Sequence, residues 1–151
     1  MHLLLRTRVA QPPARVLAGF DRALFESLAP PFPKLHLLRF DGSRPGDRVE
    51  IELAVGPKRW RWTSLITEAG QLPDGSQYFI DEGQELPVPL RYWRHRHLIE
   101  PNPRGLGSVI VEDITYRTGS RILDVLLYPA MWTQFAYRRP VYRRFFGRPV
   151  G

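Results

Sequence analysis

Residues 119–147, GSRILDVLLYPAMWTQFAYRRPVYRRFFG, give the strongest indication of the fold of this chain. Its apolar side chains recur at helical spacing and form one stripe, which consists of Leu123, Leu127, Met131, Phe135, Tyr142 and Phe146. We therefore expect an amphipathic helix at the end of the chain. Pro129 fits best in the first turn of that helix, with residues 120–128 as a lead-in. Pro140 predicts a kink or break near Arg139, because proline removes a helical hydrogen bond.

Upstream of this helix, the chain shows one strand, two short helices and then a long run of strands. Residues 2–10 alternate between two faces, and the prolines at 12 and 13 end that strand. Residues 14–28 have the spacing of two short helices. Six further strands are expected at 35–40, 49–55, 59–68, 77–81, 91–100 and 108–117, with 82–90 irregular. This order predicts a single α+β domain over residues 1–151, in which a curved sheet of seven strands wraps around the last helix and leaves a cavity beside it.

Size and composition restrict the class of protein. A chain of 151 residues with 43% apolar and 25% charged residues can build its own core and is not expected to be disordered. The absence of cysteine excludes disulfides, thiolate chemistry and cysteine-based zinc sites. No signal peptide is recognisable, and no apolar stretch approaches the ~20 residues of a membrane span. We therefore expect a cytoplasmic protein.

The net charge of +7 and the sequence pI near 10.4 favour an anionic partner. Most arginines alternate with apolar residues in the expected strands, which is typical of a solvated outer sheet face. The last helix carries a denser group of cations, namely Arg138, Arg139, Arg143, Arg144 and Arg148. These arginines fit either a favourable interaction with the helix C-terminus or peripheral attachment to an anionic membrane surface. No nucleic-acid-binding motif is present, so no specific nucleic acid is expected as a partner.

Five short segments, in their order and spacing, resemble the START-related helix-grip superfamily (SRPBCC), which includes polyketide cyclases, dehydrases and lipid carriers. The segments are Leu28-Ala29-Pro30-Pro31, Gly46-Asp47-Arg48-Val49, Trp93-Arg94-His95-Arg96-His97, residues 107–116 and Phe135-Ala136-Tyr137-Arg138. The resemblance covers nearly the whole chain and implies an antiparallel seven-stranded sheet that grips the C-terminal helix around an internal cavity. It implies no single reaction, because such proteins range from carriers to enzymes. Pro140 departs from the pattern at the end of the last helix.

A histidine–carboxylate pair is the sharpest chemical candidate. His95 and His97 share one face of their expected strand, and a turn centred on Arg104 would place His97 opposite Asp113, at a Cβ separation of ~5 Å. The pair could act as acid and base on the cavity wall, or it could be a satisfied polar pair that fixes the strand register. His95, His97 and Asp113 also have spacing that suits a metal, but no fourth ligand is evident. Neither a metal nor a cofactor is expected.

Aromatic and apolar residues near the last helix supply candidates for a binding site. The residues predicted to contact a ligand are Trp62, Trp93, His95, Tyr116, Met131, Trp132 and Phe135. Such side chains offer large apolar area, in several cases with a polar tip. We expect a non-enzymatic protein that binds, and in one version transports, a hydrophobic or amphipathic small molecule. The alternatives are a cyclase- or dehydratase-like enzyme that uses the histidine–aspartate pair, and a peripheral membrane or interaction protein that acts through its basic surface.

Overall fold

The computed structural model describes residues 1–148. Helices and strands follow one another in the predicted order. The elements are β1 (His2–Val9), α1 (Pro13–Ala18), α2 (Arg22–Ser27), β2 (Lys34–Phe40), β3 (Arg48–Val55), β4 (Lys58–Gln71), β5 (Gln77–Glu85), β6 (Tyr92–Pro101), β7 (Ser108–Arg117), α3 (Arg121–Ala136) and α4 (Arg138–Phe146).

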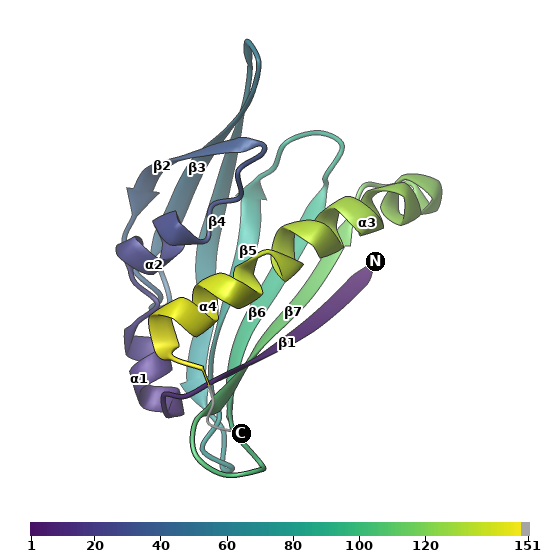
Figure 1. Ribbon diagram of the computed structural model, residues 1–151. Helices are drawn as coiled ribbons and strands as arrows, with labels where there is room; N and C mark the ends of the chain where they lie inside the picture. The colour runs from purple at the N-terminus through teal and green to yellow at the C-terminus, as the bar shows by residue number, and fades with distance from the viewer. Residues whose placement is uncertain (149–151) are drawn as a thin grey trace.

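The seven strands form one antiparallel sheet with the order β1-β7-β6-β5-β4-β3-β2. The first strand therefore pairs with the last one, and the two short helices carry the chain from β1 to the opposite edge at β2. The sheet is curved, and α3 and α4 lie end to end across its concave side (Figure 1). The predicted α+β helix-grip architecture is confirmed.

Two details of the C-terminal helix differ from the prediction. Pro129 lies inside α3 and not in its first turn, because the helix already begins after Ser120, whose hydroxyl caps it by accepting from Leu123 N–H. The helix breaks at Tyr137, two residues before the predicted position. Pro140 then occupies the first turn of α4, where a backbone N–H has no helical partner and its loss costs little.

Strand β5 is longer than predicted. It continues to Glu85, because its pairing with β4 extends past a register shift at Thr63 and Ser64. The irregular segment expected from residue 82 therefore begins only after Glu85. This extension places Asp81 in the middle of a strand and not at its end.

The packed core lies under the helices, on one half of the sheet. One cluster joins β1, β6 and β7 to the short helices and α4, and it consists of Val9, Val16, Leu24, Leu28, Ile99, Ile110, Val141, Tyr142 and Phe146. A second cluster joins the other end of the same strands to α3, and it consists of Leu3, Leu5, Leu90, Trp93, Ile114, Tyr116 and Phe135. Neither cluster includes a residue of β2 or β3. The concave face of β2 and β3 therefore lies outside both core clusters.

Candidate functional site

A cavity of about 320 Å³ lies between the helices and strands β2 to β6. Its wall also includes α2, the proline segment after α2, α3 and the first residue of α4. Within the part of the chain that the structure describes, β1 and β7 contribute no residue to this wall. The hollow therefore lies beside the packed core, mainly over β2 to β5, and Leu24, Leu28, Trp93 and Phe135 belong to both.

Most of the cavity wall is apolar. Val49, Ile51 and Leu53 alternate along β3, so all three point to the concave face, and Leu35 faces them from β2. Residues of α2 and α3 complete the wall and include Leu24, Phe25, Leu28, Met131 and Phe135. This wall suits an apolar molecule or an apolar part of one.

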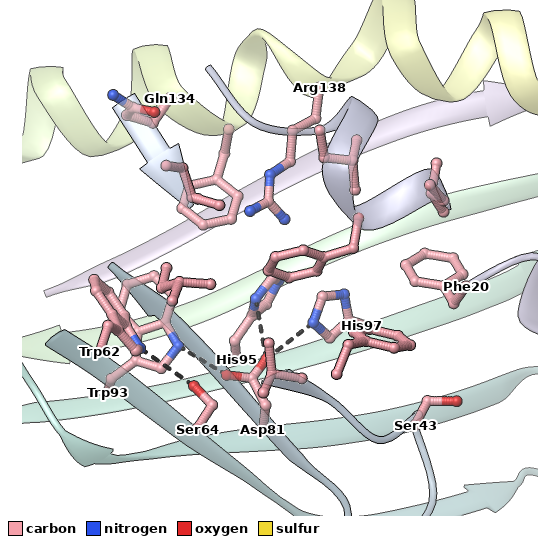
Figure 2. Close-up of a pocket in the computed structure, with 18 of the residues that line it drawn as sticks. Phe20, Ser43, Trp62, Ser64, Asp81, Trp93, His95, His97, Gln134 and Arg138 are labelled. Carbon is pink, nitrogen blue, oxygen red and sulfur yellow. Dashed lines mark hydrogen bonds and ion pairs between the residues drawn. The ribbon is translucent and has the colours of Figure 1, made fainter. Parts of the chain in front are cut away.

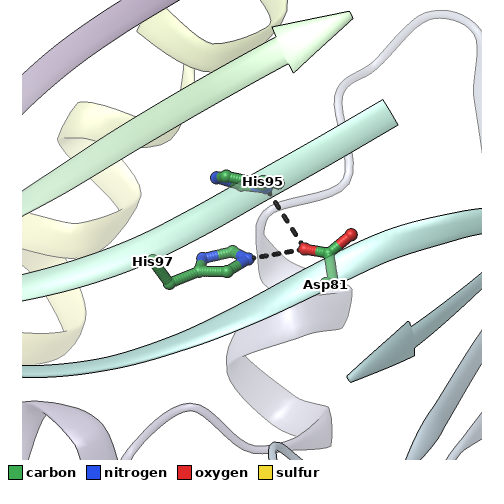
Figure 3. Close-up of side chains that lie close together, drawn as sticks. All are labelled: Asp81, His95 and His97. Atoms are coloured by element: carbon green, nitrogen blue, oxygen red, sulfur yellow. Dashed lines mark hydrogen bonds and ion pairs between the residues drawn. The ribbon is translucent and has the colours of Figure 1, made fainter. Parts of the chain in front are cut away.

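Polar side chains interrupt the apolar wall on its sheet side, where Asp81, His95 and His97 lie together and Ser64 lies nearby (Figure 2). The β5–β6 register sets Asp81 opposite His95, and His97 follows on the same face two residues later. Asp81 Oδ2 lies 3.0 Å from His97 Nε2 and 3.4 Å from His95 Nδ1. Both contacts meet at one carboxylate oxygen, as Figure 3 shows.

A second carboxylate, that of Glu112 on β7, lies on the other side of the two imidazoles. His95 Nε2–H donates to Glu112 Oε2 at 2.5 Å, and His97 Nδ1 lies 3.6 Å from the same oxygen. The Tyr142 hydroxyl donates to Glu112, and Arg138 Nη1 lies 3.5 Å from Glu112 Oε1. The Glu112 carboxylate is therefore buried but surrounded by donors, as a buried charge requires.

The electrostatics of this cluster keep both carboxylates ionised. Burial by itself would raise the pKa of Asp81, but the hydrogen bond with His97 and the charge of His95 outweigh burial and lower it. Burial is likewise outweighed at Glu112, where the charges of His95 and Arg138 hold the pKa well below its usual range. Burial, together with the charge of His95, lowers the pKa of His97. Burial and the charge of Glu112 raise the pKa of Tyr142 well above its usual value.

Aromatic rings fix the positions of the polar groups. The imidazoles of His95 and His97 have centroids 3.7 Å apart, and Phe79 stacks on His97 at 4.2 Å. Trp93 Nε1–H donates to Asp81 Oδ1 at 3.1 Å, and Trp62 packs edge-on against Trp93. Stacking therefore holds the two imidazoles at their ring faces, and the hydrogen bond from Trp93 holds the carboxylate of Asp81.

The structure brings five of the seven predicted ligand-contacting residues to the cavity wall, namely Trp62, Trp93, His95, Met131 and Phe135. Tyr116 is buried away from the cavity, and its hydroxyl donates to the carbonyl of Asp124. Trp132 is 44% exposed and lies outside the wall, because successive helical residues point about 100° apart and Met131 takes the inward position. Tyr116 and Trp132 are therefore corrections to the predicted set.

Asp113 is also a correction. The β6–β7 register pairs His97 with Glu112 and Arg96 with Asp113, one residue away from the predicted alignment. A shift of one residue reverses the facing of every side chain, so Asp113 points to the outer face, where it contacts His2 at 2.8 Å. The sequence reasoning missed Asp81 and Glu112. A signal for Glu112 was its place on the Ile110, Ile114 and Tyr116 face, where a lone charge needs buried partners.

The arginines of the last helix differ in their exposure to solvent. Arg138 is only 18% exposed and points from the helix toward His95 (Figure 2), with Glu112 at 3.5 Å, so it does not belong to an outer basic surface. Arg139 is half-buried, whereas Arg143 and Arg144 are exposed. Among the residues described, no helix is both long and apolar enough to cross a membrane.

No protein-family model matches this sequence, and no curated protein matches it significantly. Solved structures do resemble it. TTHA0849 from Thermus thermophilus is 17% identical with a TM-score of 0.58, over 97% of this chain and 94% of that one. Ara h 8.0201 is 14% identical with a TM-score of 0.58, over 95% and 98% of the two chains.

An enzyme is among the similar structures. Norcoclaurine synthase from Thalictrum flavum, solved in complex with dopamine and hydroxybenzaldehyde, is 10% identical with a TM-score of 0.65. The match covers 95% of this chain and 84% of the synthase. At such low identities these likenesses establish the fold alone. This chain has the helix-grip fold, the fold that its resemblance to the START-related superfamily implies.

Proposed function

We propose that this protein binds a hydrophobic or amphipathic small molecule in the cavity between α3 and strands β2 to β6. The observation that carries the proposal is the cavity itself, which is mostly apolar and has one localised polar cluster. Small-molecule sites usually combine an apolar wall with a few convergent polar groups.

The size and polarity of the cavity restrict the class of ligand that it can bind. A volume of about 320 Å³ lies at the lower end of the ~300–1,000 Å³ typical of ligand sites, which favours a compact ring system over a long acyl chain. Arg138 and Gln134 enter the wall from the helix side, and Asp81 and the histidines enter from the sheet. A ligand with an aromatic body and hydroxyl or carbonyl groups would match this arrangement. The compounds named with norcoclaurine synthase, dopamine and hydroxybenzaldehyde, are of this kind and support the class.

A filled-cavity variant tests the proposal. The purified protein is titrated with a panel of phenols, aromatic aldehydes, quinones and fatty acids, with quenching of Trp62 and Trp93 fluorescence as the signal. Leu53→Trp places a large ring in the cavity and should weaken binding at least ~10-fold, whereas Leu38→Trp puts the same ring at a site that is 48% exposed and should not. No saturable binding by any compound, or equal affinity in both variants, would refute the proposal.

A second candidate function is acid–base catalysis on the bound molecule, in the manner of a cyclase or dehydratase. The observation that favours it is the Asp81–His97 contact at 3.0 Å, with both side chains on the cavity wall. A neutral imidazole held by a carboxylate is suited to remove a proton from a carbon next to a carbonyl. A fixed orientation of this kind contributes ~10²–10⁴-fold to such a step.

Deuterium exchange tests this second candidate. An aromatic ketone such as phenylacetone is incubated with the protein in D2O, and exchange next to the carbonyl is followed by proton NMR. The wild-type protein should accelerate exchange, and His97→Gln should remove the acceleration while His36→Gln, at an exposed position, keeps it. Binding without acceleration would reject catalysis and leave the binding proposal intact.

A further inference from the structure

We propose that Asp81, His95 and His97 form a binding site for one divalent transition-metal ion in the cavity wall. This inference goes beyond the ligand binding proposed above, since it concerns an inorganic partner. The three residues come from β5 and β6, and all three are buried (Figure 3).

The separations between the donor atoms suit an ion. One donor atom from each residue lies within 4.8 Å of the other two. Asp81 Oδ2 is 3.0 Å from His97 Nε2 and 3.4 Å from His95 Nδ1. Metal–ligand bonds of ~2.0–2.2 Å place neighbouring donors about 2.8–3.6 Å apart in octahedral or tetrahedral geometry. The separations of 3.0 and 3.4 Å fall within this range, so an ion would bind these atoms with little movement of the side chains.

The contacts of His95 leave one of its nitrogens for an ion. His95 Nε2–H donates to Glu112 Oε2, which leaves His95 Nδ1 facing a carboxylate oxygen of Asp81. A cation between these two atoms would be attracted by both of them. A charged imidazole is the rival arrangement, and it predicts that no stoichiometric ion binds.

The surroundings hold the donors as the outer shell of a metal site does. Glu112 orients His95, and Trp93 Nε1–H donates to Asp81 Oδ1, so Oδ2, which contacts both imidazoles, is the oxygen that would bind an ion. His97 Nδ1 is buried and has no hydrogen-bond partner among the described residues. With an ion on Nε2, the imidazole proton would move to this Nδ1, which faces Glu112 Oε2 at 3.6 Å. Histidine ligands usually donate their second nitrogen to a carboxylate in this way.

The donor set defines the class of ion. Two imidazoles and one carboxylate, with the remaining positions open to a cavity, suit Zn²⁺ or Fe²⁺ and not Mg²⁺ or Ca²⁺, which prefer oxygen ligands. All three donors belong to residues of the cavity wall, so an organic molecule in the cavity could reach an open position on the ion.

Cobalt titration tests the site. The protein is stripped with EDTA, dialysed and titrated with Co²⁺, whose visible absorption reports nitrogen and oxygen ligation, and Zn²⁺ is then added as a competitor by calorimetry. We expect one ion per chain. His95→Ala, His97→Ala and Asp81→Asn should each weaken binding more than ~100-fold, and Glu112→Gln should weaken it ~10–100-fold, as is typical of an outer-shell residue. His2→Ala and His36→Ala, which alter exposed histidines, are the matched controls and should bind as the wild type does.

Two further measurements make the result decisive. Zn²⁺ should raise the unfolding temperature of the wild type by mass action but not that of His97→Ala, and circular dichroism shows that each variant is folded. The site is refuted if no stoichiometric ion binds, or if the His2 and His36 variants lose binding as the cavity variants do. Titration of the EDTA-stripped protein with the organic panel separates the two proposals, because ligand binding without ion binding rejects the metal site alone.

Discussion

The two halves of the sheet have the same alternating sequence pattern and yet differ in packing. In the half made of β1, β7 and β6, the inward side chains Leu3 and Ile114 are fully buried beneath the helices. In the half made of β2 and β3, the inward side chains Val49 and Leu53 are only half-buried and face the cavity. Alternation therefore assigns a side chain to a face, whereas the path of α3 and α4 decides whether that face is filled.

This division separates stability from binding. The packed half supplies the closely contacting side chains that resist unfolding, and the open half supplies the wall of the proposed binding site. The cluster of Asp81, His95, His97 and Glu112 lies at the border between the two, on β5, β6 and β7. Substitutions in the packed half, in the open half and in the border cluster should therefore have different effects.

The largest expected effect is a loss of stability in the packed half. Ile114→Ala removes a side chain with no exposed surface and leaves a void, so the free energy of unfolding should fall by about 2–5 kcal/mol. Leu53→Ala enlarges an existing cavity and should cost about 1 kcal/mol or less, because the side chain already lacks contacts on one side. Urea unfolding of both variants measures the difference. Similar losses for the two would mean that the halves are equally packed.

A smaller effect is expected at the arginines of α4. Arg138→Gln removes a cation beside the buried Glu112 and should lower the free energy of unfolding by about 1–3 kcal/mol, because the carboxylate keeps fewer partners. Arg144→Gln, an exposed arginine on the same helix, is the control and should change it by less than about 0.5 kcal/mol. Chemical denaturation at neutral pH measures both. Arg138 would belong to the outer surface after all if both variants unfolded at the same urea concentration.

The smallest expected effect is a pH dependence that arises at the border cluster. The pKa of His97 is lowered in the folded protein, so below ~6.5 the unfolded chain takes up a proton that the folded one does not. Stability should therefore decline as the pH falls from ~6.5. The lowered pKa values of Asp81 and Glu112 add a further decline only below ~4, where unfolded carboxyls become protonated.

Urea midpoints between pH 4.5 and 7.5 isolate the contribution of His97. His97→Asn should flatten the pH dependence relative to the wild type, and His36→Asn should not, since His36 is exposed. An unchanged slope in His97→Asn would show that His97 takes up its proton equally in the folded and unfolded states.

Much of the fold was predictable because its signals are local. Each signal lies within a short segment of the chain. Examples are the alternation in residues 49–55, the turn residues between strands and the helical stripe of residues 123–146. Two predicted boundaries were less accurate. The start of α3 is set by the cap at Ser120, ahead of Pro129, and the length of β5 is set by its pairing with β4 past Thr63, which is remote in sequence.

The candidate site was only partly predictable. His95 and His97 stand two residues apart, so their common face follows from strand geometry alone. Their carboxylate partners could not be chosen in this way, since Asp113 and Glu112 are adjacent and a one-residue change in register exchanges them. Asp81 lies 14 residues before His95 in the sequence and meets it only through the β5–β6 pairing.

The number and order of the strands, the closing helix and the side chains that share a face follow from the amino-acid sequence, because each depends on backbone geometry over a few residues. Three features arise only when the chain is folded: Asp81 and Glu112 enclose the two histidines, Arg138 points inward, and one part of the sheet remains open. These features depend on the register between strands and on the path of a helix over them, and distant parts of the chain fix both together.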